Sequence, residues 1–431
     1  MRAAASRGCA CHWSGPAMRR DSWRIGLMLA GWLTAAGAAA APSSAALQAG
    51  GRAACRAIAA QVDAVPGGGP LLLRSYDAPT AGDPPADEAA LATAAFSYDN
   101  ALAVIALTAC DRPAQARRVA LALRAAALGE ARLRNAYRAG PVGESGVPLP
   151  NGWWDAAEGR WVEDAYQMGT ATGNVAWTAL AMLAIAARDD DPAWRAAAVR
   201  LAEWTLAHTA DARGDGGFDG GVHGFDAAPQ RLRWKSTEHN ADLAAVFGLL
   251  ARGADAERWR AHAAQARGFV AAQWDASQGR FRVGTQSDGV TPNESTSGLD
   301  AQLWPLLLPD APAEWWRALA WAERLHGVRG GFDFNADRDG VWSEGTAQAI
   351  LIYRRAGRGR EARAAYAELP PVRSASGYLD ATDRPSITTG LAIGPDSTTD
   401  DFRYYRRPHL GATAWLVLGA YRFNPFTLRE R

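Results

Sequence analysis

The sequence predicts an all-α fold in which six outer and six inner helices alternate along the chain and close into a ring. Two observations predict it. Six segments begin with small or polar residues and run directly into apolar stretches, as expected of helices buried on all sides. An amphipathic stretch with one polar face precedes each of them. The inner helices then all run in one direction, so their amino ends meet at one mouth of the ring. The connections that lead into them, expected as short β-hairpins or loops, lie at the same mouth.

The elements follow in order along the chain. The amphipathic stretches predict outer helices at 46–65, 112–128, 194–205, 259–270, 312–325 and 359–368. The apolar stretches predict inner helices at 101–107, 175–185, 241–250, 301–308, 347–353 and 412–421. Ser and Thr at the inner-helix starts are residues that cap the free amides of a first turn. Asp191 and Pro192 mark the start of the outer helix at 194–205, with a cap and then proline in the first turn.

Composition excludes several classes of protein. The 431 residues include 46 Lys and Arg against 45 Asp and Glu, which argues against a nucleic-acid binder with a broad basic face. An apolar content of 48% indicates a globular chain, not a disordered or fibrous one. Four cysteines are too few for a disulfide scaffold.

The first 41 residues have the order of a secretory signal. Arg19, Arg20 and Arg24 precede an apolar run over 25–41 that ends in small residues before Pro42, with a cleavage site expected near Ala40. An uncleaved membrane anchor is the alternative, although the run is short for a bilayer span. We therefore expect one domain at 42–431, periplasmic or secreted, with no stable membrane insertion after signal removal.

Two cysteines remain after signal removal, Cys55 and Cys110. In an oxidising compartment such a pair often forms a disulfide, and two buried thiols are the other interpretation.

Ionisable side chains gather where the inner helices start. They are Asp99, Glu238, His239, Asp242, Asp300, Glu344 and His409. A buried helix start has little structural use for so many charges, although each one alone fits a cap or a buried ion pair. The loops just before these helices add further charges, among them Lys235, the only lysine in the chain, and Arg406.

Glu238 is the first candidate for a general acid. Glycosidic cleavage needs one protonated carboxyl group beside a second that stays ionised. For the second group Glu344 and Asp99 rank together, followed by Asp300. A helix cap remains an equal interpretation for Asp99 and Asp300.

Aromatic residues in the loops favour a carbohydrate ligand. The chain has 18 tryptophans, and aromatic rings offer sugar rings an apolar platform, although any one of them is a candidate for the core. The substrate-binding candidates are Lys235, His239, Asp300, Trp154, Tyr166, Trp234, Trp342, Arg406 and His409.

The six inner-helix starts, with the Gly-Gly-Phe loops at 216–218 and 330–332, resemble the six-hairpin, or (α/α)6-toroid, glycosidase-like superfamily over about residues 45–425. This architecture is shared by glycoside hydrolases, polysaccharide lyases and sugar epimerases. No cofactor and no metal is expected. Residues 335–340 have the oxygen spacing of a calcium loop, but Thr346 stands where the bidentate Glu belongs.

The leading hypothesis is an exported glycoside hydrolase with two carboxylates and a carbohydrate substrate. A polysaccharide lyase is the runner-up, with His239, Asn240, Tyr404, Tyr405, Arg406 and His409 available as base or neutralising groups. A non-catalytic carbohydrate-binding toroid is the third. An epimerase fits export poorly, and a terpene cyclase is disfavoured because the run 189–191 opens an outer helix.

Overall fold

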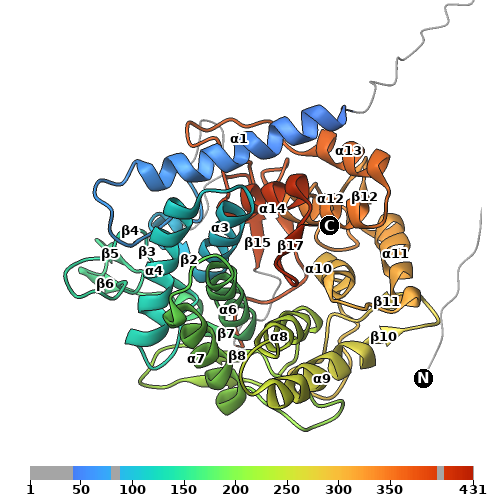
Figure 1. Ribbon diagram of the computed structural model, residues 1–431, viewed down its shortest axis with the longest axis horizontal. Coiled ribbons are helices and arrows are strands. Elements are labelled where there is room, and N and C mark those ends of the chain that lie inside the picture. Colours follow the sequence, from blue (N-terminus) through green and yellow to red (C-terminus); the bar gives the residue numbers. More distant parts are fainter. Residues whose placement is uncertain (1–41, 79–87, 396–401, 431) are drawn as a thin grey trace, which may run out of the picture. The chain divides into compact units, whose positions relative to one another are not determined.

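The computed structural model describes residues 42–78, 88–395 and 402–430, and the predicted signal segment 1–41 lies outside them. In that described part, twelve main helices alternate between an outer and an inner ring (Figure 1). The outer helices are α1 (Ser44–Asp63), α4 (Pro113–Gly129), α7 (Pro192–His208), α9 (Ala256–Ala272), α11 (Arg317–Leu325) and α13 (Gly359–Glu368). The inner helices are α3 (Ser97–Ala109), α6 (Thr172–Ala186), α8 (Thr237–Leu250), α10 (Leu299–Leu303), α12 (Ser343–Arg355) and α14 (Leu410–Tyr421). The predicted fold class is confirmed.

The inner helices form a closed ring because each packs on the next. α3 packs on α6, α6 on α8, α8 on α10, α10 on α12, α12 on α14, and α14 returns to α3. Their side chains are buried on nearly every face, as the continuous apolar runs predict. α10 is shorter than expected because the chain continues as a 3-10 turn, η1 (Trp304–Leu307), where Pro305 has no amide hydrogen for an α-helical bond.

The outer helices bury one face each, and two of them, α1 and α7, begin at side-chain caps. The Ser43 hydroxyl caps α1, and the Asp191 carboxylate accepts a hydrogen bond from the Ala193 amide at 2.9 Å ahead of Pro192 in α7. A second 3-10 turn, η2 (Ala313–Trp316), leads into α11. The disulfide Cys55–Cys110 joins α1 to the end of α3.

A repeated hydrogen bond links each inner helix to a neighbouring loop. The first amide of each inner helix donates to a carbonyl in the loop after the next outer helix, at 2.9–3.1 Å. Ser97 donates to Asn135 in this way, and Leu410 of the last inner helix donates to Ser75, after α1. The last of these bonds closes the ring, and all of them satisfy amides that a helix leaves free.

A second repeated contact explains much of the polarity at the inner-helix starts. In five of the six inner helices, the fourth residue binds the backbone of a residue in the loop that follows the preceding outer helix, as Asn100 does with Leu73. Asn240 accepts from the Phe218 amide and donates to the Phe218 carbonyl, and Gln302 does the same with Phe281. Thr346 bonds the Phe332 backbone likewise. These side chains are structural, so Asn240 is not a group that meets substrate.

Short strands occupy the outer-to-inner connections, as predicted for the mouth. Before α3 lie β1 (Leu71–Leu72), α2 (Glu88–Leu91) and β2 (Ala94–Phe96). Between α4 and α6 lie β3 (Ala136–Arg138), β4 (Gly140–Pro141), β5 (Trp153–Asp155), β6 (Arg160–Val162), α5 (Ala165–Met168) and β7 (Thr170–Ala171). The later connections hold β8 (Gly221–His223), β9 (Gln230–Leu232), β10 (Trp274–Asp275), β11 (Arg280–Phe281), β12 (Gly327–Val328), β13 (Gly331–Phe332), β14 (Ser386–Thr388) and β15 (Arg403–Tyr405). β16 (Phe423–Asn424) and β17 (Arg429–Glu430) follow α14.

The strands pair antiparallel in groups of two or three, as β1–β4, β2–β3, β5–β6, β7–β8–β9, β10–β11, β12–β13, β14–β15 and β16–β17. They therefore shape the mouth without forming a central sheet. Among the helices that the structure describes, none has the length and apolar character needed to cross a bilayer.

Candidate active site

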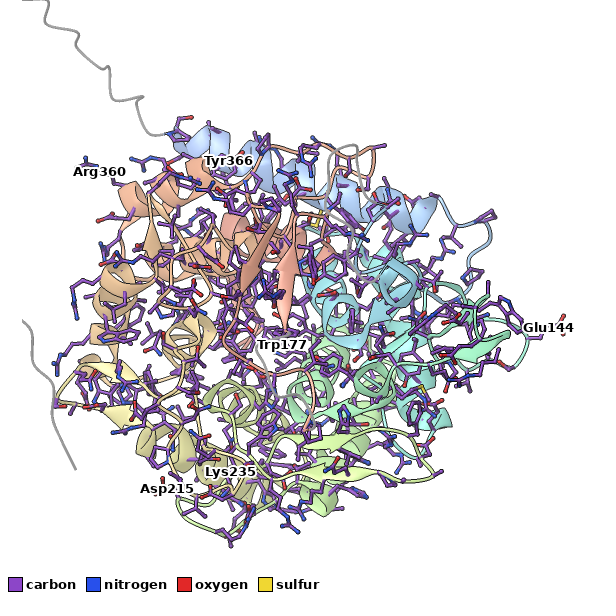
Figure 2. The ribbon with its side chains drawn as sticks, turned by 180° about the vertical axis from the view of Figure 1, so that it is seen from behind. Glu144, Trp177, Asp215, Lys235, Arg360 and Tyr366 are labelled. Atoms are coloured by element: carbon purple, nitrogen blue, oxygen red, sulfur yellow. A yellow bond between two sulfur atoms is a disulfide. The ribbon has the colours of Figure 1, made fainter. Side chains whose placement is uncertain are left out.

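The second and sixth residues of the inner helices form two layers around the ring axis. Residues four apart lie on one face of a helix. Among the described inner helices, the second positions are Tyr98, Gly173, Glu238, Asp300, Glu344 and Gly411, and the sixth positions are Leu102, Trp177, Asp242, Trp304, Gln348 and Trp415. The lower layer meets at the axis, where the Trp177 ring lies 5.2 Å from Trp304 and 5.6 Å from Trp415 (Figure 2). The upper layer is the floor of the mouth.

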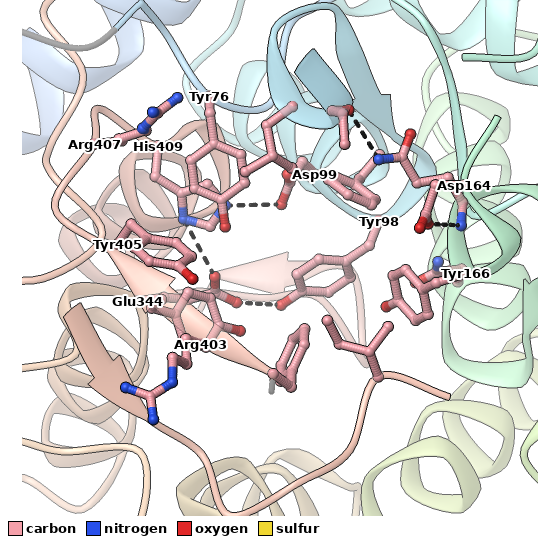
Figure 3. A pocket seen from close by; sticks show the side chains of 18 residues that line it. Tyr76, Tyr98, Asp99, Asp164, Tyr166, Glu344, Arg403, Tyr405, Arg407 and His409 are labelled. Atoms are coloured by element: carbon pink, nitrogen blue, oxygen red, sulfur yellow. Dashed lines mark hydrogen bonds and ion pairs between the residues drawn. The ribbon is translucent and has the colours of Figure 1, made fainter. Parts of the chain in front are cut away.

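A cavity of about 210 Å³ opens above one side of this floor (Figure 3). Its polar lining includes Asp99, Asp164, Asn174, Glu344 and His409, with Arg403 and Arg407. Its aromatic lining is Tyr76, Phe96, Tyr98, Tyr166, Phe402, Tyr404 and Tyr405. Carboxyl groups within an aromatic cavity suit a ligand with many hydroxyl groups and apolar C–H faces.

Glu344 is the most enclosed carboxyl group of the cavity, with 2% of its surface exposed. Its Oε1 accepts a hydrogen bond from the Tyr98 hydroxyl at 2.6 Å, and that hydroxyl accepts from Trp415 Nε1 at 3.0 Å. Burial raises the pKa of Glu344 to about 7, while His409 and the Tyr98 hydrogen bond oppose this rise. Tyr98 was not among the predicted site residues. The signal that could have found it is its second position in an inner helix, which it shares with Glu238, Asp300 and Glu344.

His409 lies between two carboxyl groups. Its Nε2 is 3.4 Å from Asp99 Oδ1 and its Nδ1 is 3.7 Å from Glu344 Oε2, with Tyr76 stacked on the ring at 4.5 Å. Burial lowers the pKa of His409, but Asp99 and Glu344 outweigh it and leave the pKa raised. The structure thus brings the predicted residues Asp99, Glu344 and His409 together.

Gly411 allows this close packing. A methyl group at Gly411 would lie 2.6 Å from Asp99 Oδ1, closer than real contacts allow, and 3.0 Å from Glu344 Oε2, which is tighter than most contacts. The glycine at this second position is therefore part of how the site is built.

Glu238 faces the same mouth on α8, outside the set of residues that line the cavity. Its side chain is 28% exposed and shares a hydrogen bond with Asp300 of α10. Burial raises the pKa of Glu238 well above its usual value, and the charges of Asp300, Asp242 and Glu344 add to the rise. Burial also raises the pKa of Asp300, which the hydrogen bond from Glu238 partly offsets. The shared hydrogen bond therefore favours a proton on Glu238, which donates to Asp300.

Two of the predicted binding residues, His239 and Trp234, lie beside Glu238. His239 Nε2 lies 3.6 Å from Glu238 Oε1, and burial lowers the pKa of His239 to about 4, which keeps the ring neutral. Trp234 packs obliquely on His239 with ring centres 5.6 Å apart. A methyl group at Gly173 would lie 2.5 Å from the His239 ring, so glycine admits this histidine.

Buried polar groups lie in the lower layer, beneath the floor of the mouth. Both carboxyl oxygens of Asp242, both polar atoms of the Gln348 amide, and the indole nitrogens of Trp177 and Trp304 are buried without a hydrogen-bond partner. Burial raises the pKa of Asp242 well above its usual value, so the group is held neutral. Gln348 was not singled out from the sequence, since only the closed ring shows that sixth positions face the axis.

Lys235 does not meet the cavity, which corrects the expectation that it contacts substrate. Its side chain is buried, its ammonium donates to the Arg213 carbonyl at 2.6 Å, and it lies 3.4 Å from Asp211 Oδ2. Figure 2 shows it toward the rim of the ring, away from Trp177. Ser236 directs it there, because this residue caps α8 and pairs with Gly284. The lone lysine is half of a buried ion pair.

The remaining predicted residues are divided between cavity, core and surface. Tyr166 lines the cavity. Trp342 is in the core at 1% exposure, packed against Phe334 and Tyr404, which corrects its assignment to the groove. Arg406 lies between the two arginines that line the cavity and is not itself a lining residue. Trp154 stands exposed on the β5–β6 hairpin.

The sequence with calcium-loop spacing forms a tight acidic turn. Asp333, Asp337 and Asp339 place carboxyl oxygens within 4.8 Å of one another, and Asp333 was not among the predicted ligands. Thr388 donates to Asp337 at 2.5 Å, and the Asp339 amide donates to Asp333 at 2.8 Å. Thr346 is turned away to its contact with the Phe332 backbone.

Comparison with known proteins identifies the architecture. No protein-family model and no curated protein matches the sequence. A solved wild-type glycosidase matches with a TM-score of 0.58 at 14% identity, over 88% of this chain and 98% of that one. Cellobiose 2-epimerase from Spirochaeta thermophila matches with a TM-score of 0.59 at 13% identity, over 88% and 96%. The chain is a six-hairpin (α/α)6 toroid.

Two further matches carry descriptions that refer to different carbohydrates. The GH76 α-mannanase of Bacteroides thetaiotaomicron has a TM-score of 0.54 at 11% identity, over 88% of this chain and 98% of that one. A glycosidase variant in complex with glucose has a TM-score of 0.58 at 15% identity, over 88% and 98%. At these low sequence identities the structural matches show the fold alone, so the reaction has to be inferred from the chain's own site.

Proposed function

We propose that this toroid is an exported glycoside hydrolase in which Glu238 is the general acid and Glu344 is the ionised partner. The observation that carries the proposal is the unequal surroundings of these two carboxyl groups at one mouth. Both carboxyl groups have acidic neighbours, but Glu344 also has the Tyr98 hydroxyl and His409 beside it, which lower its pKa. Carboxyl groups whose surroundings push their pKa values apart supply the acid and the base of glycosidic cleavage.

Glu238 is suited to protonate a leaving-group oxygen. Its hydrogen bond with Asp300 and the charges of the nearby acids favour the protonated form. Its partial exposure leaves the carboxyl group within reach of a bound sugar. As the glycosidic C–O bond breaks, the proton moves from Glu238 to the departing oxygen and Glu238 becomes a carboxylate. Water supplies the oxygen that bonds to the sugar carbon, and a carboxylate of the site takes the proton that this water releases.

Glu344 is suited to act as the carboxylate. The Tyr98 hydroxyl donates to one oxygen and His409 faces the other, so both neighbours stabilise negative charge. Its pKa of about 7 places the ionised form within reach of neutral pH. Asp99 orients His409 and thereby acts on Glu344 indirectly, as a positioning residue.

The cavity supports a carbohydrate ligand. Tyr166, Phe402 and Tyr404 offer ring faces, while Asn174 offers an amide group for hydroxyls. The solved toroid in complex with glucose is consistent with this ligand class.

The site favours hydrolysis over the lyase reaction. A lyase needs a neutral histidine or an ionised tyrosine as base. The pKa of His409 is raised, which favours the imidazolium, and burial raises the pKa of Tyr404 and Tyr98 well above 10.0. His239 is neutral, but it lies beside Glu238 and not in the cavity lining.

The disulfide supports export, because disulfides persist in oxidising compartments. The predicted signal at 1–41 and a periplasmic or secreted location belong to the same proposal. Expression of the full chain with an epitope tag, followed by fractionation and amino-terminal sequencing, tests it. Retention of an uncleaved chain in the cytosol would contradict export.

The reaction is tested on aryl glycosides, gluco- and mannooligosaccharides and uronic-acid polymers. Reducing ends report hydrolysis, and ultraviolet absorbance reports the unsaturated product of a lyase. We expect reducing ends without absorbance, and losses of at least about a hundredfold in kcat/KM for Glu238→Gln and for Glu344→Gln, in the range found for general acid–base groups. The matched control is Glu323→Gln, which alters a glutamate bonded to Tyr353 of α12 far from the mouth. Full activity in either mouth variant, or an unsaturated product, contradicts the assignment.

A further inference from the structure

The exposed aromatic side chains of the described residues are confined to one part of the mouth. Trp154, Trp161 and Phe225 are 63%, 43% and 41% exposed. Trp154 and Trp161 lie on the β5–β6 hairpin between α4 and α6, and Phe225 lies between β8 and β9, before α8. All three therefore lie in outer-to-inner connections, on the same side of the ring as Glu238 and Glu344. Figure 1 shows the hairpin projecting at the edge of the ring.

The two tryptophans form one surface. Trp154 and Trp161 are directly opposite in the antiparallel register of β5 and β6, so their side chains lie on the same face of the hairpin. The turn is closed by Asp155, whose Oδ1 accepts hydrogen bonds from the amides of Ala157 and Glu158 at 2.8 and 3.1 Å. The pair is thus carried by a well-defined turn.

Trp161 is held in place, while Trp154 is open to a ligand. The Arg138 guanidinium lies 4.8 Å from the centre of the Trp161 ring. The Trp161 indole also lies over the backbone of Gly152, where an added methyl group would come within 2.6 Å of Nε1. Exposed indoles fixed in this way offer a flat apolar face at little cost in conformational entropy.

The hairpin is anchored on the wall of the cavity. Asn151, just before β5, donates to Gln167 Oε1 at 2.6 Å, and both side chains donate to the Ala90 carbonyl. Asp164, two residues after β6, caps α5 by accepting from the Gln167 amide. Asp164, Gln167 and Ala90 all line the cavity. The base of the hairpin that carries the two tryptophans is therefore fixed to residues that line the cavity.

We propose that Trp154 and Trp161 form a distal platform that binds a neutral polysaccharide chain extending out of the cavity. The ligand class follows from the chemistry of the surface, since sugar C–H faces stack on aromatic rings. Charges beside the platform are mixed, with Arg138 and Arg160 near Asp155 and Glu158, which favours no strongly charged polymer. The identification of the polymer as a substrate rests on the proposed function, but its binding does not.

Binding is tested by affinity electrophoresis of the mature protein through gels that contain soluble mannan, xylan or β-glucan. Trp154→Ala/Trp161→Ala is compared with wild type and with the control Leu325→Ala, an exposed apolar residue at the end of α11. We expect at least one polymer to retard the wild type and the control, and the double variant to bind about tenfold or more weakly, as two stacking contacts imply. Thermal melting verifies that the double variant is folded.

Activity and association give separate readouts. On a polymer substrate the double variant should show a raised KM, with kcat/KM on an aryl monosaccharide unchanged. If neither the wild type nor the double variant hydrolyses any substrate, the proposed function is wrong, but the electrophoresis still tests whether the platform binds polysaccharide. The platform is wrong if the wild type binds none of the polymers, or if the double variant binds them equally. It is also wrong if the tryptophans instead mediate dimerisation in size-exclusion chromatography or binding to phospholipid vesicles.

Discussion

Removing the Tyr98 hydroxyl tests whether Glu344 acts as an anion. Tyr98→Phe deletes the donor that lies 2.6 Å from Glu344 Oε1 and also leaves Trp415 Nε1 without its acceptor. The Tyr98 hydrogen bond lowers the pKa of Glu344, so its loss should raise that pKa above its present value of about 7. Hydrogen bonds to charged groups contribute about 1.5–3 kcal/mol, which corresponds to tenfold or more in the ionisation equilibrium.

The expected signature is a displaced pH profile. If ionised Glu344 is needed, the acidic limb of kcat/KM moves upward by about one pH unit or more. Activity below pH about 7 then falls by roughly tenfold, and much of it returns at higher pH. The assay is kcat/KM on an aryl glycoside across the pH range over which the protein remains folded.

The matched control is Tyr353→Phe. Tyr353 lies on α12 and, like Tyr98, donates its hydroxyl to a glutamate, here Glu323 at 2.8 Å, but it does not line the cavity. This variant should leave the acidic limb in place. An unmoved limb in Tyr98→Phe, or a uniform loss of activity at every pH, would refute the role of Glu344 as the titrating carboxylate.

Three further predictions concern stability and packing. Burial raises the pKa of Glu344 from 4.5 to about 7, so the stability of the native protein should fall as pH rises through this range. In denaturant melts at several pH values, Glu344→Gln should be more stable than wild type by up to about 3 kcal/mol above pH about 7, with no gain below pH 4.5. An equal stability difference at high and low pH would contradict a buried charge on Glu344. Gly411→Ala should lower kcat/KM at least about tenfold with a stability loss of about 1–3 kcal/mol, whereas Gly248→Ala, with open space around it, should do neither in the same assays. Reduction of Cys55–Cys110, which are 55 residues apart, should destabilise the fold by about 4 kcal/mol, and a Cys55→Ser/Cys110→Ser variant should show no further effect of reductant in thermal melts.

The layered site explains why some site residues were found from sequence and others were not. Glu238, Asp300 and Glu344 were found because a charge directly before an apolar run is conspicuous. Tyr98 occupies the equivalent position, but a tyrosine before an apolar run reads as part of the core. The equivalence is visible only when the helices are superimposed as members of one ring.

Lys235 and Trp342 show the opposite error. Both lie beside candidate acids in the sequence, at helix starts where the backbone turns sharply. The pairing of Ser236 with Gly284 sends the Lys235 side chain to Asp211, and the packing of Trp342 on Phe334 buries its ring. Contacts with residues distant in the chain decide where the Lys235 and Trp342 side chains point, and the spacing of residues along the sequence does not predict these contacts.

The sequence by itself determined the alternation of helices and the end of the ring at which the charges gather. Whether a helix is buried on one face or on all faces determines the order of its apolar and polar residues, so the sequence predicts it. Because the inner helices run in the same direction, their amino ends lie at the same end of the ring. The tertiary structure decided which carboxyl groups share a proton, which histidine lies between two acids, and which tryptophan is left exposed. Those outcomes depend on distances of a few ångströms across the ring, which are fixed only when all the inner helices pack together.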